Sequence, residues 1–319
     1  MSAIVVQELR RTFAGQVAVD NLSLSVEAGQ IYGLVGPDGA GKTTTLRLLA
    51  GLLDPDGGRV ALLGRDPFGR DGSFRESLGY MPQQYSLYGD LTVDENLAFF
   101  REMACLSREA FAARKERLLA LTRLAPFGRR RASALSGGMY KKLALACVLL
   151  HEPKILLLDE PTNGVDPVSR REFWDLLHGF LADGMAIVFA TPTMDEAARC
   201  HHVGLLYQGR LLAEGAPSEL VRAFDHPVFR VAGERASVES WIEKSPDVLA
   251  FTPAGEQLRI VVRRGRELLV RGAEGDALRL VLRGRDGSRS PAFDATPASP
   301  TFEDVFLARV HERHEQTEA

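Results

Sequence analysis

A glycine-rich segment spans residues 36–43 and reads Gly36-Pro37-Asp38-Gly39-Ala40-Gly41-Lys42-Thr43. The apolar run at residues 31–35 predicts a short buried strand before it, and residues 42–50 have a helical pattern after it. Strand, glycine turn and helix in this order are the context in which G-x-x-x-x-G-K-[ST] binds phosphate. A simple connecting turn is the alternative, and the presence of every fixed position of the motif disfavours it.

The chemistry expected of this segment follows from its backbone and from two side chains. Inward-pointing N–H groups and the N-terminus of the helix would surround phosphate oxygens. Lys42 would reach the β- and γ-phosphates of a nucleotide, and Thr43 would offer its hydroxyl to Mg²⁺. The neighbouring Thr44 is expected to contribute to the same phosphate site.

A second apolar run, at residues 155–158, ends in two acids and predicts a buried parallel strand. Asp159 at the strand end would hold Mg²⁺ through water, and Glu160 would orient or deprotonate an attacking water. Alone, this pattern is explained equally well by an Asp that caps a following helix. The phosphate-binding segment upstream favours the catalytic interpretation.

Composition limits the classes of protein to consider. The chain has 319 residues and a net charge of -3, so its charge gives no support for nucleic-acid binding. Cys105, Cys147 and Cys200 are far apart, which predicts a reducing compartment and neither a disulfide framework nor a metal site. We expect no signal peptide at the start and no membrane span, since no apolar run reaches about 18 residues.

The pattern along the chain predicts two domains. Residues 1–220 alternate between apolar strands and helices, as in an α/β domain around a mainly parallel sheet, with short strands over residues 4–26. Residues 226–319 are predicted to form a smaller α/β domain, in which a Pro/Ser/Thr-rich stretch at 291–301 leads to a final helix from Phe302 to about His314. Arginines cluster between Arg259 and Arg289. Interleaved acids favour a solvated face there over a partner surface.

The segment Leu135-Ser136-Gly137-Gly138-Met139 opens another predicted helix with exposed N–H groups and a hydroxyl, which is a second anion-binding helix end. Together with the two motifs above, it resembles the signature motif of the ABC ATPase superfamily, which usually ends in Gln where this chain has Met139. The resemblance covers roughly residues 4–218. The closing residues 300–307 resemble the end of ATPases from ABC-2-type exporters. The residues of the glycine-rich and signature motifs are similar to those in the amino-terminal half of tandem drug-efflux ATPases.

The resemblance implies a P-loop NTPase fold of ABC type. Such a fold has a mainly parallel core sheet, an antiparallel β-subdomain and a helical signature subdomain, here at about residues 86–150, and the C-terminal α/β domain would be an accessory domain. ATP and Mg²⁺ are the implied ligands. Ser136, Gly137 and Gly138 would bind the ATP held by a facing ATPase subunit.

Three further residues acquire roles from the resemblance. Phe13 would stack on adenine, although a packed aromatic of the β-subdomain core is the alternative. Gln83 matches the Q-loop glutamine that contacts Mg²⁺ or water, and residues 85–96 after it resemble the stretch that grips the membrane partner. Asp166 lies in a segment similar to the D-loop, where it would face the opposite subunit.

One position departs from the family pattern. The family has a switch histidine after the strand that follows the D-loop, and this chain has Pro192 there, which offers no side-chain donor or acceptor. His201 and His202 lie further on and are interpreted as ordinary surface or packing residues. We therefore expect a slowed site and a second, different ATPase subunit that keeps its histidine, in preference to a homodimer.

The sequence thus predicts an ATP-hydrolysing subunit at the inner, cytoplasmic face of the plasma membrane. It would power a separate integral membrane permease that exports drugs or other hydrophobic compounds, with no nucleic-acid partner. A regulatory module that dimerises on binding ATP and hydrolyses little is the main alternative. A soluble ABC protein of translation or DNA repair is disfavoured, because neither a second ATPase half nor a long coiled coil is visible.

Overall fold

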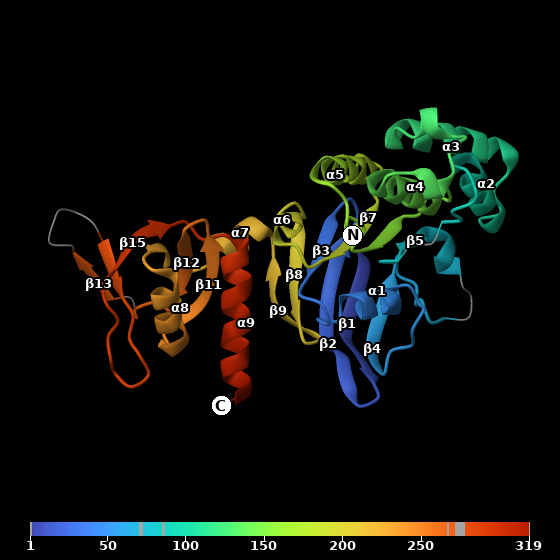
Figure 1. The fold of residues 1–319 in the computed structure, drawn as a ribbon. Coiled ribbons are helices and arrows are strands. Elements are labelled where there is room, and N and C mark those ends of the chain that lie inside the picture. Colours follow the sequence, from blue (N-terminus) through green and yellow to red (C-terminus); the bar gives the residue numbers. More distant parts are fainter. Residues whose placement is uncertain (1, 70–72, 85–86, 267, 272–277, 319) are drawn as a thin grey trace. The chain divides into compact units, whose positions relative to one another are not determined.

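The computed structural model describes residues 2–69, 73–84, 87–266, 268–271 and 278–318 (Figure 1). The chain forms two compact units, Met1–Leu211 and Leu212–Ala319. Each unit has its own apolar core. None of the helices in these described ranges combines the length and the apolarity needed to cross a membrane.

A six-stranded sheet with the order β5-β6-β7-β3-β8-β9 forms the centre of the first unit. Its strands are β3 (Ile31–Val35), β5 (Leu78–Met81), β6 (Ile155–Asp159), β7 (Ala186–Thr191), β8 (His202–Tyr207) and β9 (Arg210–Gly215). The pairings from β5 to β8 are all parallel, which confirms the predicted core. Every residue of β3, β6 and β7 is buried, as expected where both faces of a sheet are covered.

An antiparallel sheet with the order β2-β1-β4 is the second layer of this unit. It consists of β1 (Ser2–Phe13), β2 (Gln16–Glu27) and β4 (Gly57–Leu62). The prediction of short strands over residues 4–26 was wrong, because β1 and β2 are 12 residues each and form one long hairpin. The helix α1 (Lys42–Leu49) contributes Leu46 and Leu49 to a core shared with strands of both sheets.

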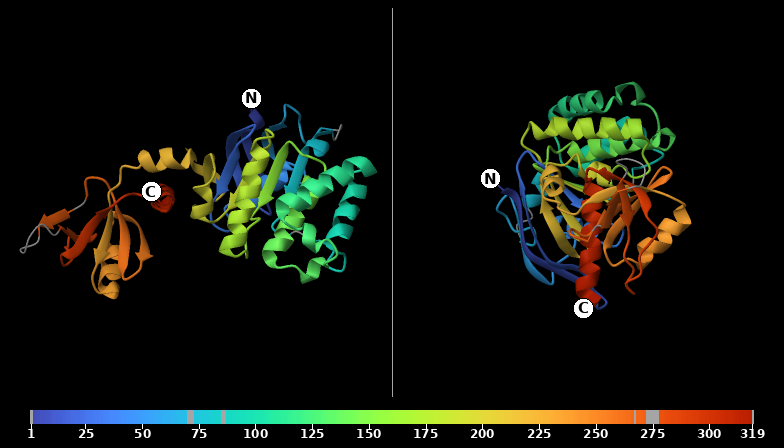
Figure 2. Two further views of the ribbon diagram at one scale, coloured as in Figure 1. Left: turned by 90° about the horizontal axis from the view of Figure 1, so that it is seen from above. Right: turned by 90° about the vertical axis from the view of Figure 1, so that its left-hand side faces the viewer.

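Further helices of this unit follow α1 along the chain. They are α2 (Val93–Met103), α3 (Arg108–Thr122), α4 (Gly137–Leu149), α5 (Pro167–Leu181) and the short α6 (Met194–Ala197), with single 3-10 turns at Ser73–Ser77, Ala125–Phe127 and Ala132–Ala134. Figure 2 shows α2 and α3 gathered away from the β1–β2 hairpin, in blue. All of α4 from Lys142 to Leu149 is buried, since α2, α3, α5 and β5 contact this helix.

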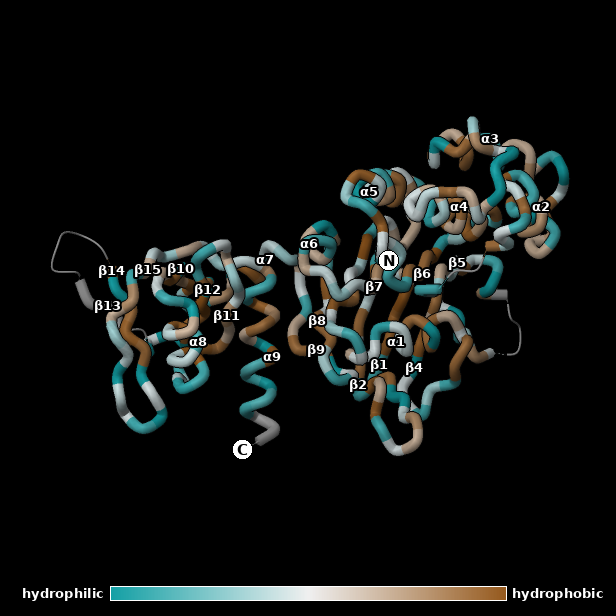
Figure 3. The backbone as a smooth tube through the Cα atoms, viewed as in Figure 1, coloured by the Kyte–Doolittle hydropathy of each residue, from teal (hydrophilic) through white to brown (hydrophobic). Residues whose placement is uncertain are grey.

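The second unit is an antiparallel sheet with the order β11-β12-β10-β15-β14-β13 and helices on both faces. Its elements are α7 (Pro217–Arg222), β10 (Val228–Ala232), α8 (Arg235–Lys244), β11 (Val248–Ala254), β12 (Gln257–Val262), β13 (Leu268–Arg271), β14 (Leu278–Val281), β15 (Phe293–Ala298) and α9 (Phe302–Glu318). Figure 3 shows an apolar first half of α9 followed by a hydrophilic second half.

Two expectations for this unit need correction. The Pro/Ser/Thr-rich stretch contains a full strand, β15, which pairs with β10. Arg259, the first of the clustered arginines, is not on a solvated face, because alternation along β12 directs it away from the α8 side and toward Asp304 of α9. That guanidinium bonds both carboxylate oxygens of Asp304 and is 12% exposed.

Candidate functional site

The residues predicted to bind phosphate and Mg²⁺ lie at one edge of the parallel sheet, because parallel strands end on the same side. β3 leads into the glycine turn at residues 36–41, β5 leads toward Gln83, and β6 ends at Asp159 with Glu160 next. β7 ends at Thr191, whose carbonyl oxygen accepts a hydrogen bond of 3.3 Å from the N–H of Gly36. Four strand ends therefore meet around one turn.

The glycine turn surrounds a cavity of about 260 Å³, here called the loop hollow. Its lining consists of Ala18, Asp38, Gly39, Gly41, Lys42, Thr43, Thr44, Gln83 and Glu160. Gly41 has a φ of 106°, and a Cβ there would collide with the carbonyl oxygen of Ala18 on β2. A side chain at Gly36 would likewise collide with the carbonyl oxygen of Leu206, so close backbone approach fixes these two positions as glycine.

Lys42 lines this hollow, and its side chain is 4% exposed. Its Nζ donates to the carbonyl oxygens of Gly36 at 2.9 Å and Pro37 at 3.0 Å, and it forms an ion pair with Oε1 of Glu160 at 3.2 Å. The carboxylate of Asp38 is 3.9 Å from the same ammonium but is almost fully exposed. Glu160 therefore neutralises this ammonium, and an anion that enters the hollow must compete with that carboxylate for Lys42.

Glu160 is held from several sides. Its Oε2 accepts hydrogen bonds from Nε2 of Gln83 at 2.9 Å and from Nδ2 of Asn163 at 3.5 Å. Its backbone has a φ of +47°, a left-handed conformation that costs on the order of 1 kcal/mol for a residue with a side chain. The N–H of Glu160 bonds the carbonyl oxygen of Ala190, so pairing with β7 maintains this backbone while the carboxylate faces the hollow.

Asp159 provides the best fit to a divalent cation. Its Oδ1 accepts a hydrogen bond of 3.1 Å from the hydroxyl of Thr43, whereas its Oδ2 is buried with no partner in the described part of the chain. Burial raises the pKa of Asp159, with only partial compensation from Thr43 and from the charge of Lys42. An unsatisfied buried carboxylate oxygen beside a hydroxyl suits a hard cation such as Mg²⁺. The amide of Gln83 donates to Glu160, and its role as a further ligand of Mg²⁺ stays a prediction.

Two residues near the hollow were missed at the sequence level. Asn163 approaches Glu160 from the turn after β6. Lys141 lies on α4, and its Nζ donates to the backbone carbonyl oxygen of Gln83 at 3.3 Å. Burial lowers the pKa of Lys141, while the charges of Asp159 and Glu160 act in the opposite direction. A pair of lysines, Lys141 and Lys142, one turn into a mostly apolar helix was the available signal for this second cation.

The signature residues form a separate cluster that does not line the loop hollow. Ser136 caps α4 by accepting a hydrogen bond from the N–H of Met139, and Asp166 caps α5 by accepting from Val168 and Ser169. These bonds hold the pKa of Asp166 below its usual value. The N-termini of α4 and α5 touch at Gly138, where a Cβ would collide with Ser169, and Gly137 lies beside the carbonyl oxygen of Gly164.

Phe13 lies at the end of β1 and is 41% exposed. The guanidinium of Arg11 is 4.9 Å from the centroid of its ring. The ring is therefore not the packed core aromatic of the alternative interpretation. Stacking on adenine stays a prediction, since Phe13 does not line the loop hollow.

Pro192 directly follows β7 and is exposed. The residues around it are fixed by Glu196, which is buried and accepts hydrogen bonds from the hydroxyls of Thr191, at 2.6 Å, and Thr162. Thr162 belongs to the turn after Glu160, so Glu196 joins the turns that follow β6 and β7. The side chain of Pro192 has no donor, so it cannot form a hydrogen bond to a ligand in the hollow.

The two later histidines lie elsewhere. Nδ1 of His201 accepts a hydrogen bond from the N–H of Ile31, at the amino end of β3, and His202 packs near Tyr32. Of the predicted partner-gripping segment 85–96, residues 85 and 86 lie outside the described residues. The described remainder is anchored to the helical part, since the N–H of Leu87 donates to the hydroxyl of Tyr140 on α4.

Comparison with known proteins adds independent findings. Residues 19–163 match the family model described as ABC transporter. The Probable multidrug ABC transporter ATP-binding protein YbhF of Escherichia coli (strain K12) is 39% identical over 311 residues, which are 96% of this chain and 52% of that protein. The chain thus spans about half the length of this relative. Nod factor export ATP-binding protein I of Cupriavidus metallidurans is 37% identical over 310 residues, 96% of this chain and 97% of that protein.

Solved structures with the same fold are similar to about two thirds of the chain. One is the ATP binding subunit of an ABC transporter, with a TM-score of 0.63 and 28% identity, covering 69% of this chain and 92% of that one. Another is the dimeric structure of a bacterial ABC transporter cassette, with a TM-score of 0.61 and 26% identity, covering 67% of this chain and 98% of that one.

Proposed function

The chain belongs to the ABC transporter ATP-binding family, and from this premise we propose that it binds ATP with Mg²⁺ in the loop hollow and hydrolyses it to power export through a separate membrane permease. The observation that supports this proposal most strongly is that two side chains from different strand ends contact the carboxylate of Glu160. Lys42 and Gln83, from different strand ends, both contact Glu160 within 3.2 Å. Hydrolysis of a phosphoanhydride needs this combination of a cation, a water-orienting amide and a base.

The residues have separate roles in this proposal. The turn N–H groups from Gly36 to Thr44 and the ammonium of Lys42 would bind the phosphates, and Mg²⁺ held by Thr43 and Asp159 would neutralise phosphate charge. A triphosphate carries more charge than the Glu160 carboxylate, so its arrival would draw Lys42 away from Glu160. Glu160 would then accept the proton of the attacking water that Gln83 helps to position.

The proposed function also needs a second ATPase subunit that faces this one. The signature cluster of Ser136, Gly137, Gly138 and Asp166 lies outside the loop hollow, which supports a role in the ATP site of a facing subunit. Without a donor at Pro192, hydrolysis in this chain's own site would be slow, since one lost transition-state donor costs about 10²–10³ in rate. A different ATPase chain that keeps its histidine is therefore the proposed partner.

Cargo and location are proposed from the relatives. One relative is named for multidrug transport and another for Nod factor export, which supports outward transport of drugs or other hydrophobic compounds. We place the chain on the cytoplasmic, inner face of the plasma membrane, with residues 1–220 as the ATP-binding domain and 226–319 as an accessory domain. A regulatory module that closes on ATP without much hydrolysis is the second candidate, and Pro192 is the observation that favours it.

Steady-state ATP hydrolysis by three proteins tests the proposal: wild type, Glu160→Gln and Pro192→His. We expect slow turnover by wild type, a rate at least tenfold higher for Pro192→His, and loss of turnover with retained ATP binding for Glu160→Gln. Pro291→His, an exposed proline changed in the second unit, is the matched control and should equal wild type. Fast turnover by wild type that Pro192→His does not increase would refute the need for a histidine-bearing partner. Turnover that survives Glu160→Gln would refute the role of Glu160.

A further inference from the structure

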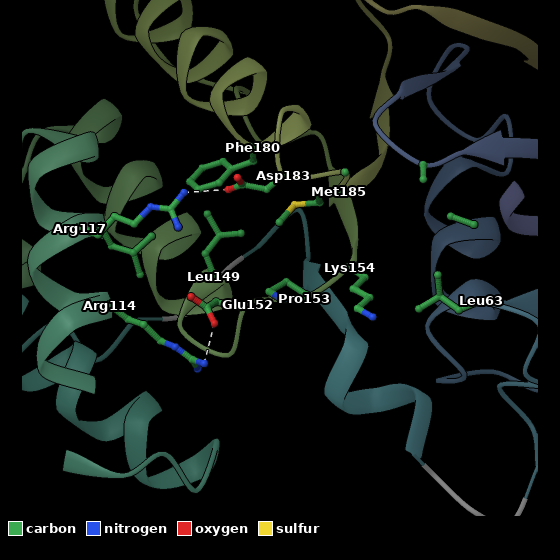
Figure 4. A pocket seen from close by; sticks show the side chains of 14 residues that line it. Leu63, Arg114, Arg117, Leu149, Glu152, Pro153, Lys154, Phe180, Asp183 and Met185 are labelled. Carbon is green, nitrogen blue, oxygen red and sulfur yellow. Dashed lines mark hydrogen bonds and ion pairs between the residues drawn. The ribbon is translucent and has the colours of Figure 1, made fainter. Parts of the chain in front are cut away.

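A second cavity lies in the first unit at the opposite ends of the strands that carry the catalytic residues. It has a volume of about 420 Å³ and is called the basal cavity here (Figure 4). Lys154 and Met185, which line it, directly precede β6 and β7, whereas Asp159 and Thr191 end those strands. The five residues of β6 and the six of β7 separate the two ends by roughly 16–20 Å. The basal cavity shares no lining residue with the loop hollow, so ATP does not account for it.

The walls of the basal cavity are largely apolar and come from separate elements. Leu118 of α3, Leu149 of α4 and Phe180 of α5 face it, each with less than a tenth of its surface exposed, and Met185 does so from the turn before β7. Leu63, after β4, lies across the opening (Figure 4). A volume in the range of small-molecule sites with such walls suits an apolar ligand body.

The charged groups at the cavity differ in their pairing. Arg114 bonds the carbonyl oxygen of Leu150 at 3.0 Å and pairs with Glu152 at 2.6 Å. Arg117 pairs with Asp183 at 2.8 Å. Figure 4 shows both pairs as dashed lines that run from the arginines of α3 to Glu152 and Asp183. These two arginines are therefore neutralised within the protein.

Lys154 is different, because its ammonium has no hydrogen-bond or ion-pair partner among the residues that the structure describes. Lys154 is exposed, so the cavity has beside its apolar walls one solvated positive charge that no described residue pairs with. A ligand that matches it has one negative charge and an apolar body. The hydrophobic part would displace water from the walls, and the anion would pair with Lys154.

We propose that the basal cavity is a binding site for small amphipathic monoanions, such as an apolar chain that ends in a carboxylate. The ligand joins α3 to the turns that precede β6 and β7. It therefore stabilises the first unit from a position remote from ATP. ATP and the anion can occupy their two sites at the same time.

Calorimetric titration with decanoate tests this proposal, with decyltrimethylammonium as a probe of equal chain length and opposite charge. Both are used on the full chain and below the concentrations at which they form micelles. Decanoate should bind at one site and raise the melting temperature of the first unit, with or without ATP, and the cation should bind at least tenfold more weakly. Binding of both probes with equal affinity, or no binding of decanoate at millimolar concentration, would overturn the proposal.

Two variants locate the binding. Lys154→Gln should lower the affinity for decanoate by up to about fivefold, as expected for loss of one partly exposed ion pair. Lys244→Gln, an exposed lysine of the second unit, is the matched control and should leave the affinity unchanged. Ala28→Trp should abolish binding by filling the cavity from its exposed rim, and its melting temperature without ligand shows whether it folds. Unaltered affinity in both Lys154→Gln and Ala28→Trp would exclude the basal cavity.

Discussion

Single residues of the phosphate turn are constrained by backbone geometry to different degrees. Gly39 and Gly41 both have positive φ, of 78° and 106°. A Cβ at Gly39 would meet no atom within 4 Å, whereas one at Gly41 would collide with the carbonyl oxygen of Ala18. Only Gly41 therefore combines backbone strain with a steric conflict against β2.

This difference predicts the effect of two alanine substitutions on ATP affinity. Gly39→Ala should weaken binding by about fivefold, since it adds only the strain of a left-handed backbone, about 1 kcal/mol. Gly41→Ala should weaken it by more than a hundredfold, because the turn must open to relieve the collision. Fluorescence titration with a labelled ATP analogue measures both. Equal affinities in the two variants would contradict the geometric argument.

At the residue scale, sequence motifs predicted which side chains meet but not how they are held. The glycine turn, Lys42, Asp159 and Glu160 were identifiable because their spacing is tied to strand ends. The left-handed backbone of Glu160 was not, since it depends on pairing with Ala190 of a strand far along the chain. The contact of Lys141 with the backbone of Gln83 is also tertiary, and no local pattern encodes it.

At the scale of elements, one ion pair connects α9 to β12 in the second unit. Arg259 bonds Asp304 through three hydrogen bonds of 2.6 to 3.0 Å, and the carboxylate also accepts from the N–H of Thr301. Burial raises the pKa of Asp304, but the bonds from Arg259 and Thr301 outweigh it and hold the pKa below its usual value. The carboxylate thus stabilises the folded state in its charged form.

Asp304→Asn should destabilise the second unit by about 2–3 kcal/mol, because it leaves the guanidinium of Arg259 buried without a counter-ion. The pH dependence has a definite sign. With a folded pKa below the unfolded value of about 4, the stabilisation is present above pH 4 and is lost as pH falls through the folded pKa. Hydrogen exchange of α9 amides at several pH values measures both effects.

The matched control is Asp294→Asn, which removes the exposed pair between Asp294 and Arg279. An exposed pair contributes less than about 1 kcal/mol, so this variant should leave exchange in α9 unchanged. Equal protection of α9 in wild type and Asp304→Asn at neutral pH would show that the pair does not hold the helix.

Element boundaries show where sequence reasoning was limited. Periodicity predicted β3, β6 and β7 because fully buried parallel strands are continuous apolar runs. β15 was missed because its sequence, FDATPA, contains a proline and only one large apolar residue. Its strand conformation results from pairing with β10, a tertiary effect that overrides local propensity.

At the scale of the whole molecule, the two units have separate apolar cores that are formed by different arrangements of sheets and helices. The first core includes Leu46 of α1 between a parallel and an antiparallel sheet, and the second core packs residues such as Ile260 against α8. The proposed ATP site belongs entirely to the first unit. A ligand that binds one folded unit stabilises that unit by mass action.

Calorimetry of the full chain should therefore resolve two unfolding transitions, one for each unit. MgATP should raise the melting temperature of the first unit only. At a hundredfold excess of ligand over its dissociation constant, the shift corresponds to about 2.7 kcal/mol. Ile260→Ala should lower only the melting temperature of the second unit, because it creates a cavity at a fully buried position of the second core. The expected loss in the free energy of unfolding of that unit is about 2–4 kcal/mol. A single transition that responds to both MgATP and Ile260→Ala would instead show that the two units unfold as one cooperative unit.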